Sequence, residues 1–273
     1  MKKILIPFDF TEVSINALQY AMDMSQDSDE LHLVHVHSGL LSIQSPLMIR
    51  AGMDYMECIQ KEIEATILKN LGINSLPENL TIVSLTGNPV HAITKYANKT
   101  LMDMAVVGTR DKYDMIDRWI GTISLGLVKR LFIPVYLIPR YASFESYNKA
   151  LIASDHHLAK TPVLHQIKTW NDDYNAYIKF LHVRENISSV YNEEAEQIVR
   201  ELYEKENVDF SFEISTVTSR DIGDSLLSSA YNFKADILIV IAENQSFMHS
   251  LLFKSLSKEL ILKSSIPVLF LHD

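Results

Sequence analysis

Five apolar runs occur in the same order in each half of this 273-residue chain, and this internal repeat constrains the fold more than any other feature. In the first half the runs are ILIPFD (4–9), LHLVHVH (31–37), LTIVSLTG (80–87), MDMAVVGT (102–109) and FIPVYLIP (132–139). In the second half they are ALIASD (150–155), YIKFLHVR (177–184), DFSFEISTV (209–217), ADILIVIA (235–242) and SIPVLFLH (265–272). Several are continuous rather than alternating, which predicts strands of a parallel sheet that is covered on both faces.

Segments with helical spacing of apolar residues lie between these runs. They cover residues 11–24, 90–99, 123–132, 222–233 and 256–263. Because strand and helix alternate, the sequence predicts βαβ units. We therefore expect an α/β protein of two tandem domains, 1–140 and 149–273, each with an open five-stranded parallel sheet.

Each half ends on the same tripeptide, IPV, at 133–135 and 266–268. Two equivalent edge strands in one chain are able to pair about a pseudo-two-fold axis, which would remove two exposed sheet edges. The sequence thus predicts a pseudo-dimer within the chain, in which Val135–Ile138 meets Val268–Leu271.

Charge and hydropathy exclude several classes of protein. The net charge of -9 argues against a sequence-independent nucleic-acid binder, which would need a basic surface. No stretch approaches the ~18 apolar residues of a membrane span. A single cysteine, Cys58, rules out a disulfide within the chain. These features predict a cytoplasmic protein that binds neither nucleic acid nor membrane.

In an open parallel sheet, ligands bind beyond the carboxyl ends of the strands, where the strand order reverses. In the first half this places Asp9, residues 35–37 and the segment from Gly108 at one edge. Gly121 and Thr122 precede a predicted helix, whose first N–H groups would favour an anion. The pattern indicates a phosphate-binding loop.

Several segments together resemble the universal stress protein family, in two tandem copies that span almost the whole chain. The first copy shows ILIPFDFTEVSINALQYA (4–21), LVHV (33–36), GNPVHAI (87–93) and DMAVVGT (103–109). It also keeps the spacing of the family's ATP-binding motif, Gly-x-x-Gly-x9-Gly-Ser/Thr, over residues 108–122. Here the second glycine of the motif is replaced by Asp111.

The resemblance implies an adenine nucleotide alpha hydrolase-like, Rossmann-like fold and dimerisation through the last strand. A homodimer is thus an alternative to pairing within the chain. It also implies a stress-response or regulatory role, with ATP or AMP as ligand and Mg²⁺ as an accompanying ion. The matching positions are Pro7 and Asp9 beside adenosine, Val36 at adenine through its backbone, and Gly108, Arg110, Gly121, Thr122 and the amide of Ile123 around ribose and phosphates.

Asp111 alters what such a loop would accept. A carboxylate repels phosphate, by roughly 3–4 kcal/mol at 4–6 Å in an effective dielectric of about 20. Arg110, Lys112 and Arg118 are close enough in sequence to neutralise part of this charge. A nucleotide with fewer charges, such as AMP, is favoured over ATP. With no base or carboxylate pair evident beyond Asp9 and Asp111, we expect slow ATP hydrolysis at most.

The second copy lacks the glycines of the motif, with Ala242, Gln245 and Ser255 in their places. We expect this domain to be structural or regulatory and not to bind ATP in the family manner. The alternative function is a non-nucleotide member that acts through protein contacts, a small ligand or a metal in the second domain. The weak candidates for metal ligands are Asp155, His156 and His182, which come from adjacent predicted strand ends.

Overall fold

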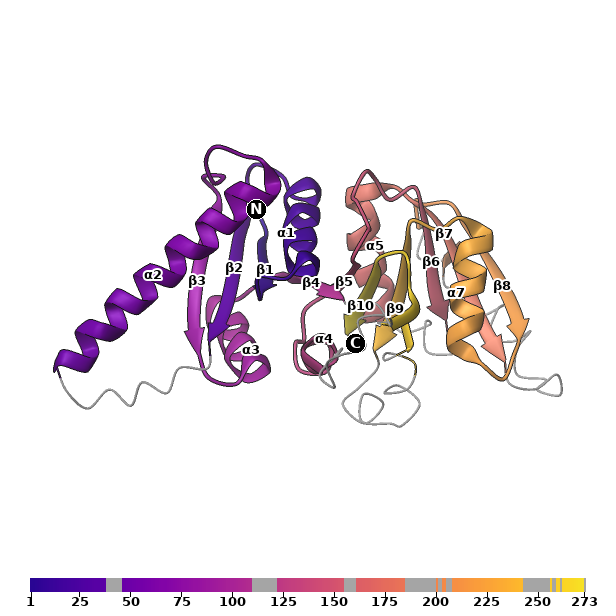
Figure 1. Ribbon diagram of the computed structural model, residues 1–273. Helices are drawn as coiled ribbons and strands as arrows, with labels where there is room; N and C mark the ends of the chain where they lie inside the picture. Colours follow the sequence, from indigo (N-terminus) through magenta and orange to yellow (C-terminus); the bar gives the residue numbers. More distant parts are fainter. Residues whose placement is uncertain are drawn as a thin grey trace. The chain divides into compact units, whose positions relative to one another are not determined.

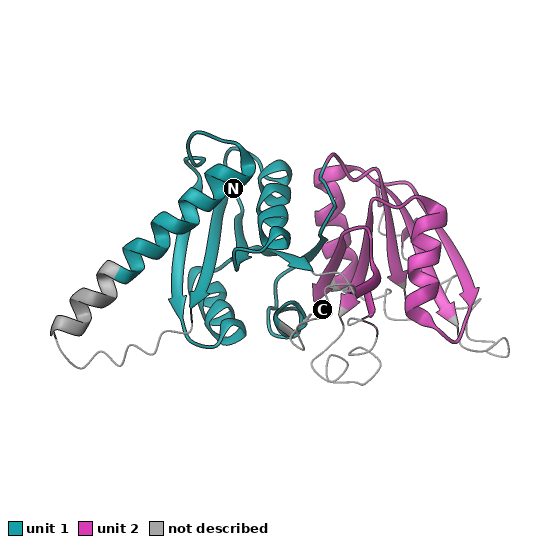
Figure 2. Ribbon diagram, in the orientation of Figure 1, with its two compact units in different colours: residues 1–144 teal, residues 145–273 magenta. Residues whose placement is uncertain are grey.

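The computed structural model describes residues 1–37, 46–109, 122–154, 161–184, 200, 203–204, 208–242, 256, 259–260 and 262–272. The chain divides into two compact units, Met1–Phe144 and Glu145–Asp273, coloured separately in Figure 2. Each unit has five strands and its own buried apolar core.

Unit 1 alternates strands and helices along the chain (Figure 1). Its elements are β1 (Lys3–Phe8), α1 (Glu12–Met24), β2 (Glu30–His37), α2 (Pro46–Leu71), β3 (Leu80–Thr86), α3 (Pro89–Thr100), β4 (Met104–Thr109), α4 (Thr122–Val128) and β5 (Val135–Pro139). The strand order is β3-β2-β1-β4-β5, and the neighbouring strands are parallel. The chain thus moves outward from β1 to β3 and then returns to the other side of β1, which makes β1 and β4 the switch point.

Local sequence sets where the helices of unit 1 begin and end. The side chain of Thr11 caps α1 by accepting from the N–H of Ser14, and the side chain of Asn88 caps α3 by accepting from the N–H of His91. Pro89 occupies the first turn of α3, where its missing N–H has no cost. α1 packs on β1 and β4 and also touches α2, whereas α3 touches β2 and α4.

Unit 2 repeats this alternation. The described elements are β6 (Lys149–Ser154), α5 (Thr161–Tyr174), β7 (Tyr177–Arg184), β8 (Phe212–Thr218), α7 (Ile222–Phe233), β9 (Ile237–Ala242) and β10 (Val268–His272). The strand order is β10-β9-β6-β7-β8, again with parallel neighbours. Its switch point is therefore formed by β6 and β9.

Individual contacts are repeated in the two units. The backbone N–H of Lys3 donates to Asp103 Oδ2 at 2.7 Å, and that of Lys149 donates to Asp236 Oδ2 at 2.8 Å. In both cases the aspartate lies just before the strand at the switch point. This agreement shows that the two halves repeat in structure as well as in sequence.

The predicted α/β class is confirmed, with parallel strands at all ten apolar runs. β5 and β10 are shorter than their runs, because 132–134 and 265–267 precede the strands. Helices α2 and α5 were not predicted from the sequence. None of the helices in the described part of the chain is long and apolar enough to cross a membrane. The pairing of Val135–Ile138 with Val268–Leu271 stays a prediction from the sequence.

Candidate functional site

The end of β1 positions the first predicted site residues. Pro7 lies opposite Val34 of β2, whereas the register between β1 and β4 ends at Leu5 and Ala105, before either strand ends. Proline has no N–H to donate to a second neighbour, which is consistent with this early end. At the switch point, Pro7 is thus paired with β2, and the pairing of β1 with β4 ends before it.

Asp9 follows directly and is exposed. Its Oδ1 accepts from the N–H of Thr11 at 3.2 Å and from Thr11 Oγ1 at 2.5 Å, and its own N–H donates to Ser14 Oγ at 3.4 Å. The bond from the Thr11 N–H forms an Asx turn, in which an aspartate side chain accepts from the backbone N–H two residues later. Asp9 is therefore held at the strand end with its carboxylate facing solvent.

The end of β2 supplies Val36. β2 continues past its last β1 pair, Phe8 and His35, and here Val36 and His37 are paired with β3 alone. His35 Nδ1 lies 2.9 Å from the Phe8 carbonyl, so this nitrogen carries the proton and donates. Val36 thus lies at the same edge of the sheet as Asp9, one strand away.

His37, two residues after His35, lies on the same side of β2, and the two rings stack with centroids 6.5 Å apart. Its side chain is buried under α2, where Nε2 is 2.9 Å from Met56 Sδ and Tyr55 packs edge-on at 5.5 Å. Burial, and to a smaller extent His35, lower the pKa of His37. His37 is therefore neutral near pH 7.

Gly108 lies in β4, where a side chain would collide with α1. A Cβ at this position would come 2.8 Å from the carbonyl carbon of Val13, which is backbone and cannot rotate away. The sequence predicts that Gly108 allows close approach of phosphate. The structure shows a different reason for glycine here, since it lets the first turn of α1 rest against β4.

Beyond β4, α4 begins at Thr122, and Ile123 in its first turn is 38% exposed. Ser124 donates from Oγ to the Gly108 carbonyl at 3.3 Å, which ties the start of α4 to the end of β4. Arg110, Asp111 and Gly121 lie outside the described residues. Of the predicted site in unit 1, the structure therefore places Pro7, Asp9, Val36, Gly108, Thr122 and Ile123 at the carboxyl ends of β1, β2 and β4 or at the start of α4.

Of the three weak metal candidates in unit 2, His182 is the one that lies within the described residues. Asp155 and His156 lie outside the described residues. His182 lies in β7 opposite Ser154, the last residue of β6. Its position in β7 matches that of His35 in β2, since each pairs with the end of the first strand of its unit.

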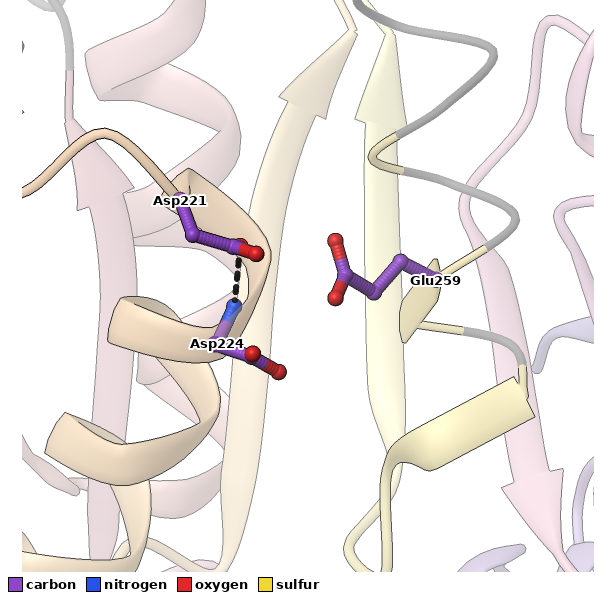
Figure 3. Close-up of side chains that lie close together, drawn as sticks. All are labelled: Asp221, Asp224 and Glu259. Atoms are coloured by element: carbon purple, nitrogen blue, oxygen red, sulfur yellow. Dashed lines mark hydrogen bonds between the residues drawn. The ribbon is translucent and has the colours of Figure 1, made fainter.

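Unit 2 does hold an acidic cluster that the sequence analysis missed. Asp221, Asp224 and Glu259 place carboxylate oxygens within 4.8 Å of one another (Figure 3). Asp221 Oδ1 caps α7 by accepting from the N–H of Asp224 at 2.9 Å. Lys263 Nζ binds Asp224 Oδ1 at 2.8 Å and also binds Glu259, and these bonds raise the pKa of Lys263. Lys263 thus offsets part of the negative charge and joins Asp224 and Glu259 in an ion-pair network.

The origin of this cluster is visible when the two IPV runs are aligned. Gly126 then falls opposite Glu259, and Val90 opposite Gly223. In unit 1 a Cβ on Gly126 would come 2.8 Å from Val90 Cγ2, and in unit 2 a Cβ on Gly223 would come 2.5 Å from Glu259 Cδ. In unit 1 the large residue of the pair is Val90 of α3, whereas in unit 2 the matching position of α7 is Gly223 and the large residue is Glu259. The single glycine of the second half, Gly223, was the sequence signal for this contact.

Comparison with known proteins identifies the family. The universal stress protein family profile matches residues 1–139. A universal stress protein of Methanocaldococcus jannaschii is 23% identical over 150 residues, which are 51% of this chain and 82% of that protein.

Solved structures show the same fold over the whole chain. A universal stress protein from Archaeoglobus fulgidus superposes with a TM-score of 0.73 at 18% identity, covering 99% of this chain and 98% of the other. A Pseudomonas aeruginosa structure assigned to the same family gives a TM-score of 0.58 at 10% identity, covering 100% and 93%. The chain belongs to the universal stress protein family, as a tandem two-domain member.

Proposed function

We propose that this protein is a stress-response or regulatory protein whose unit 1 binds an adenine nucleotide, AMP or ATP, and whose unit 2 has a structural or regulatory role. One observation carries the proposal. Asp9, Val36 and Gly108 lie at the carboxyl ends of β1, β2 and β4, the three neighbouring strands around the switch point. This is where open α/β sheets bind ligands.

Each of these residues offers a contact suited to a nucleotide. Asp9 presents a fixed carboxylate that is able to accept from ribose hydroxyls. Val36 offers backbone N–H and C=O groups at the end of β2, a donor and an acceptor of the kind that an adenine edge needs. Thr122 and the amide of Ile123 open α4 beyond Gly108, where phosphate or an accompanying Mg²⁺ would lie.

Unit 2 lacks the glycines that would let its backbone approach phosphate, so we assign nucleotide binding to unit 1 alone. Asp111 in unit 1 favours AMP over ATP for the electrostatic reason given above. Turnover of ATP, if any, is slow, because Asp9 is the one carboxylate at the described strand ends of unit 1.

Native mass spectrometry of the freshly purified full chain, followed by calorimetry with ATP, ADP and AMP, tests the proposal. We expect co-purified or added adenine nucleotide to bind, and Gly121→Asp to abolish binding. Gly72→Asp is the matched control, because Gly72 has a left-handed φ of 65° and open space around it, which aspartate tolerates. Absence of heat with all three nucleotides contradicts the proposal, and a co-purified metal or other small molecule favours the alternative function.

A further inference from the structure

We propose that the ring of Phe10 is the platform on which the base of the bound nucleotide stacks, so that unit 1 selects ligands that carry a planar base. This inference rests on the proposed nucleotide site. It adds to that site a residue that contacts the base, whereas the residues of the glycine motif are assigned to phosphate and ribose.

The position of the Phe10 ring is the first reason. Phe10 directly follows Asp9, and its ring packs edge-on against His35 with centroids 5.0 Å apart. The centroid of the Phe8 ring lies 5.1 Å from that of Phe10. His35 is itself fixed by its bond to the Phe8 carbonyl and directly precedes Val36. The ring therefore lies at the strand ends, next in sequence to the proposed ribose contact and against the residue that precedes the proposed adenine contact.

The backbone of Phe10 is the second reason. Four residues other than glycine have positive φ in the described chain: Phe10 (65°), Leu101 (53°), Asn175 (51°) and Lys234 (56°). Leu101 and Lys234 end α3 and α7 in the left-handed conformation common at helix ends, and asparagine tolerates it. Phe10 has neither explanation. An aromatic residue held in this region is unusual, and such residues gather at functional sites.

The neighbouring residues keep Phe10 in this conformation. Asp9 Oδ1 accepts from both the N–H and the Oγ1 of Thr11, which brackets Phe10 on both sides. Thr11 also begins α1. The ring is half-buried, so its contacts with Phe8 and His35 leave part of its surface open. A fixed and partly exposed ring loses little conformational freedom when a base stacks on it.

Stacking predicts a particular selectivity. A base has a flat π-face that gains affinity on an aromatic side chain, and a bare sugar phosphate has none. Phe10 should therefore contribute to the binding of AMP and contribute nothing to the binding of ribose 5-phosphate.

Calorimetry of the full chain with AMP and with ribose 5-phosphate tests the inference. We expect Phe10→Gly to weaken AMP binding about tenfold or more, to leave ribose 5-phosphate binding unchanged, and to fold, since glycine adopts positive φ readily. Phe10→Tyr should keep the wild-type preference for AMP. Leu101→Gly makes the same kind of backbone change at an exposed helix end and should change neither affinity.

The outcomes separate this inference from the function on which it rests. If the wild type binds AMP and Phe10→Gly binds it equally well, the stacking role is wrong and the nucleotide site stands. A parallel loss of both ligands would show that Phe10 only shapes the loop, which also overturns the inference. Failure of the wild type to bind AMP contradicts the site and the stacking role together.

Discussion

Asp111 is the residue at which the first domain departs from the family motif, and we propose that it limits how many phosphates the loop accepts. Removing its carboxylate should strengthen ATP binding about tenfold, because a like charge near the phosphates is lost. The effect on AMP should be smaller, since AMP carries less charge. Calorimetry of Asp111→Gly at low and high salt measures both effects, and salt should reduce the gain.

Asp111→Asn is the matched variant for this prediction, because it removes the charge and keeps the size of the side chain. If Asp111→Gly strengthens ATP binding and Asp111→Asn does not, the width of the loop is the obstacle rather than repulsion. Unchanged ATP affinity in both variants would show that Asp111 does not face the phosphates.

Protonation of His272 makes the stability of the protein depend on pH. Burial at the end of β10 lowers its pKa from 6.5 to about 4. Between pH 4 and pH 6.5 the unfolded chain binds a proton at His272 that the folded chain does not. The contribution of His272 to the free energy of unfolding is therefore complete above pH 6.5 and is lost as the pH falls towards 4. A pKa shift of this size corresponds to about 3 kcal/mol in the free energy of unfolding.

Urea unfolding at pH 7.5 and pH 4.5 checks this expectation. The wild type should lose about 2 kcal/mol more stability than His272→Phe between the two conditions. His91→Phe is the control, because His91 is exposed and its removal should leave the pH dependence as it is in the wild type. Equal losses in wild type and His272→Phe would contradict the assignment.

At the scale of elements, the close contact of α1 with β4 depends on Gly108. Gly108→Ala should destabilise unit 1 by about 2 kcal/mol, because the new methyl group would meet the backbone of Val13. Gly126→Ala is the comparison, since its methyl group would meet only the side chain of Val90, which is able to shift. Urea unfolding of both variants measures the difference in the free energy of unfolding. An equally small loss of stability at both positions would show that α1 shifts easily away from β4.

The exchanged contact between the units predicts coupling in unit 2. Gly223→Val should destabilise it by about 2 kcal/mol, since the new side chain would overlap Glu259. Adding Glu259→Gly reproduces the pair found in unit 1 and should recover about 1 kcal/mol or more of the lost stability. A double-mutant cycle measures this coupling. Additive effects would mean that Gly223 and Glu259 do not determine each other.

The strands could be predicted from sequence because buried parallel strands are apolar along their whole length. α2 was missed although its buried residues, Ile59, Ile63 and Ile67, have helical spacing. They form a narrow stripe among exposed polar residues, which a search for continuous apolar runs passes over. The positions of Asp9, Val36 and Gly108 at the carboxyl ends of strands could be predicted, because the apolar runs locate those ends. The conformation of Phe10 could not, because it depends on hydrogen bonds made by its neighbours.

At the scale of the whole molecule, the sequence predicts that Val135–Ile138 and Val268–Leu271 pair within the chain. A paired strand has backbone partners on both sides, whereas half the amides of an edge strand remain open. Hydrogen exchange should therefore protect peptides covering these segments as well as it protects β1. Fast exchange of alternate amides in either segment would contradict the pairing. Sedimentation of the full chain would then show whether a homodimer covers these edges.

The central claim is that one unit binds nucleotide and the other does not. Calorimetric titration of the full chain with AMP tests it most directly, because it gives the number of sites. We expect one AMP per chain, greatly weakened binding in Asp9→Ala, and unchanged binding in Asp155→Ala, which alters the matching residue of the second half. Two sites per chain, no binding, or a site lost through Asp155→Ala and kept in Asp9→Ala would contradict the account.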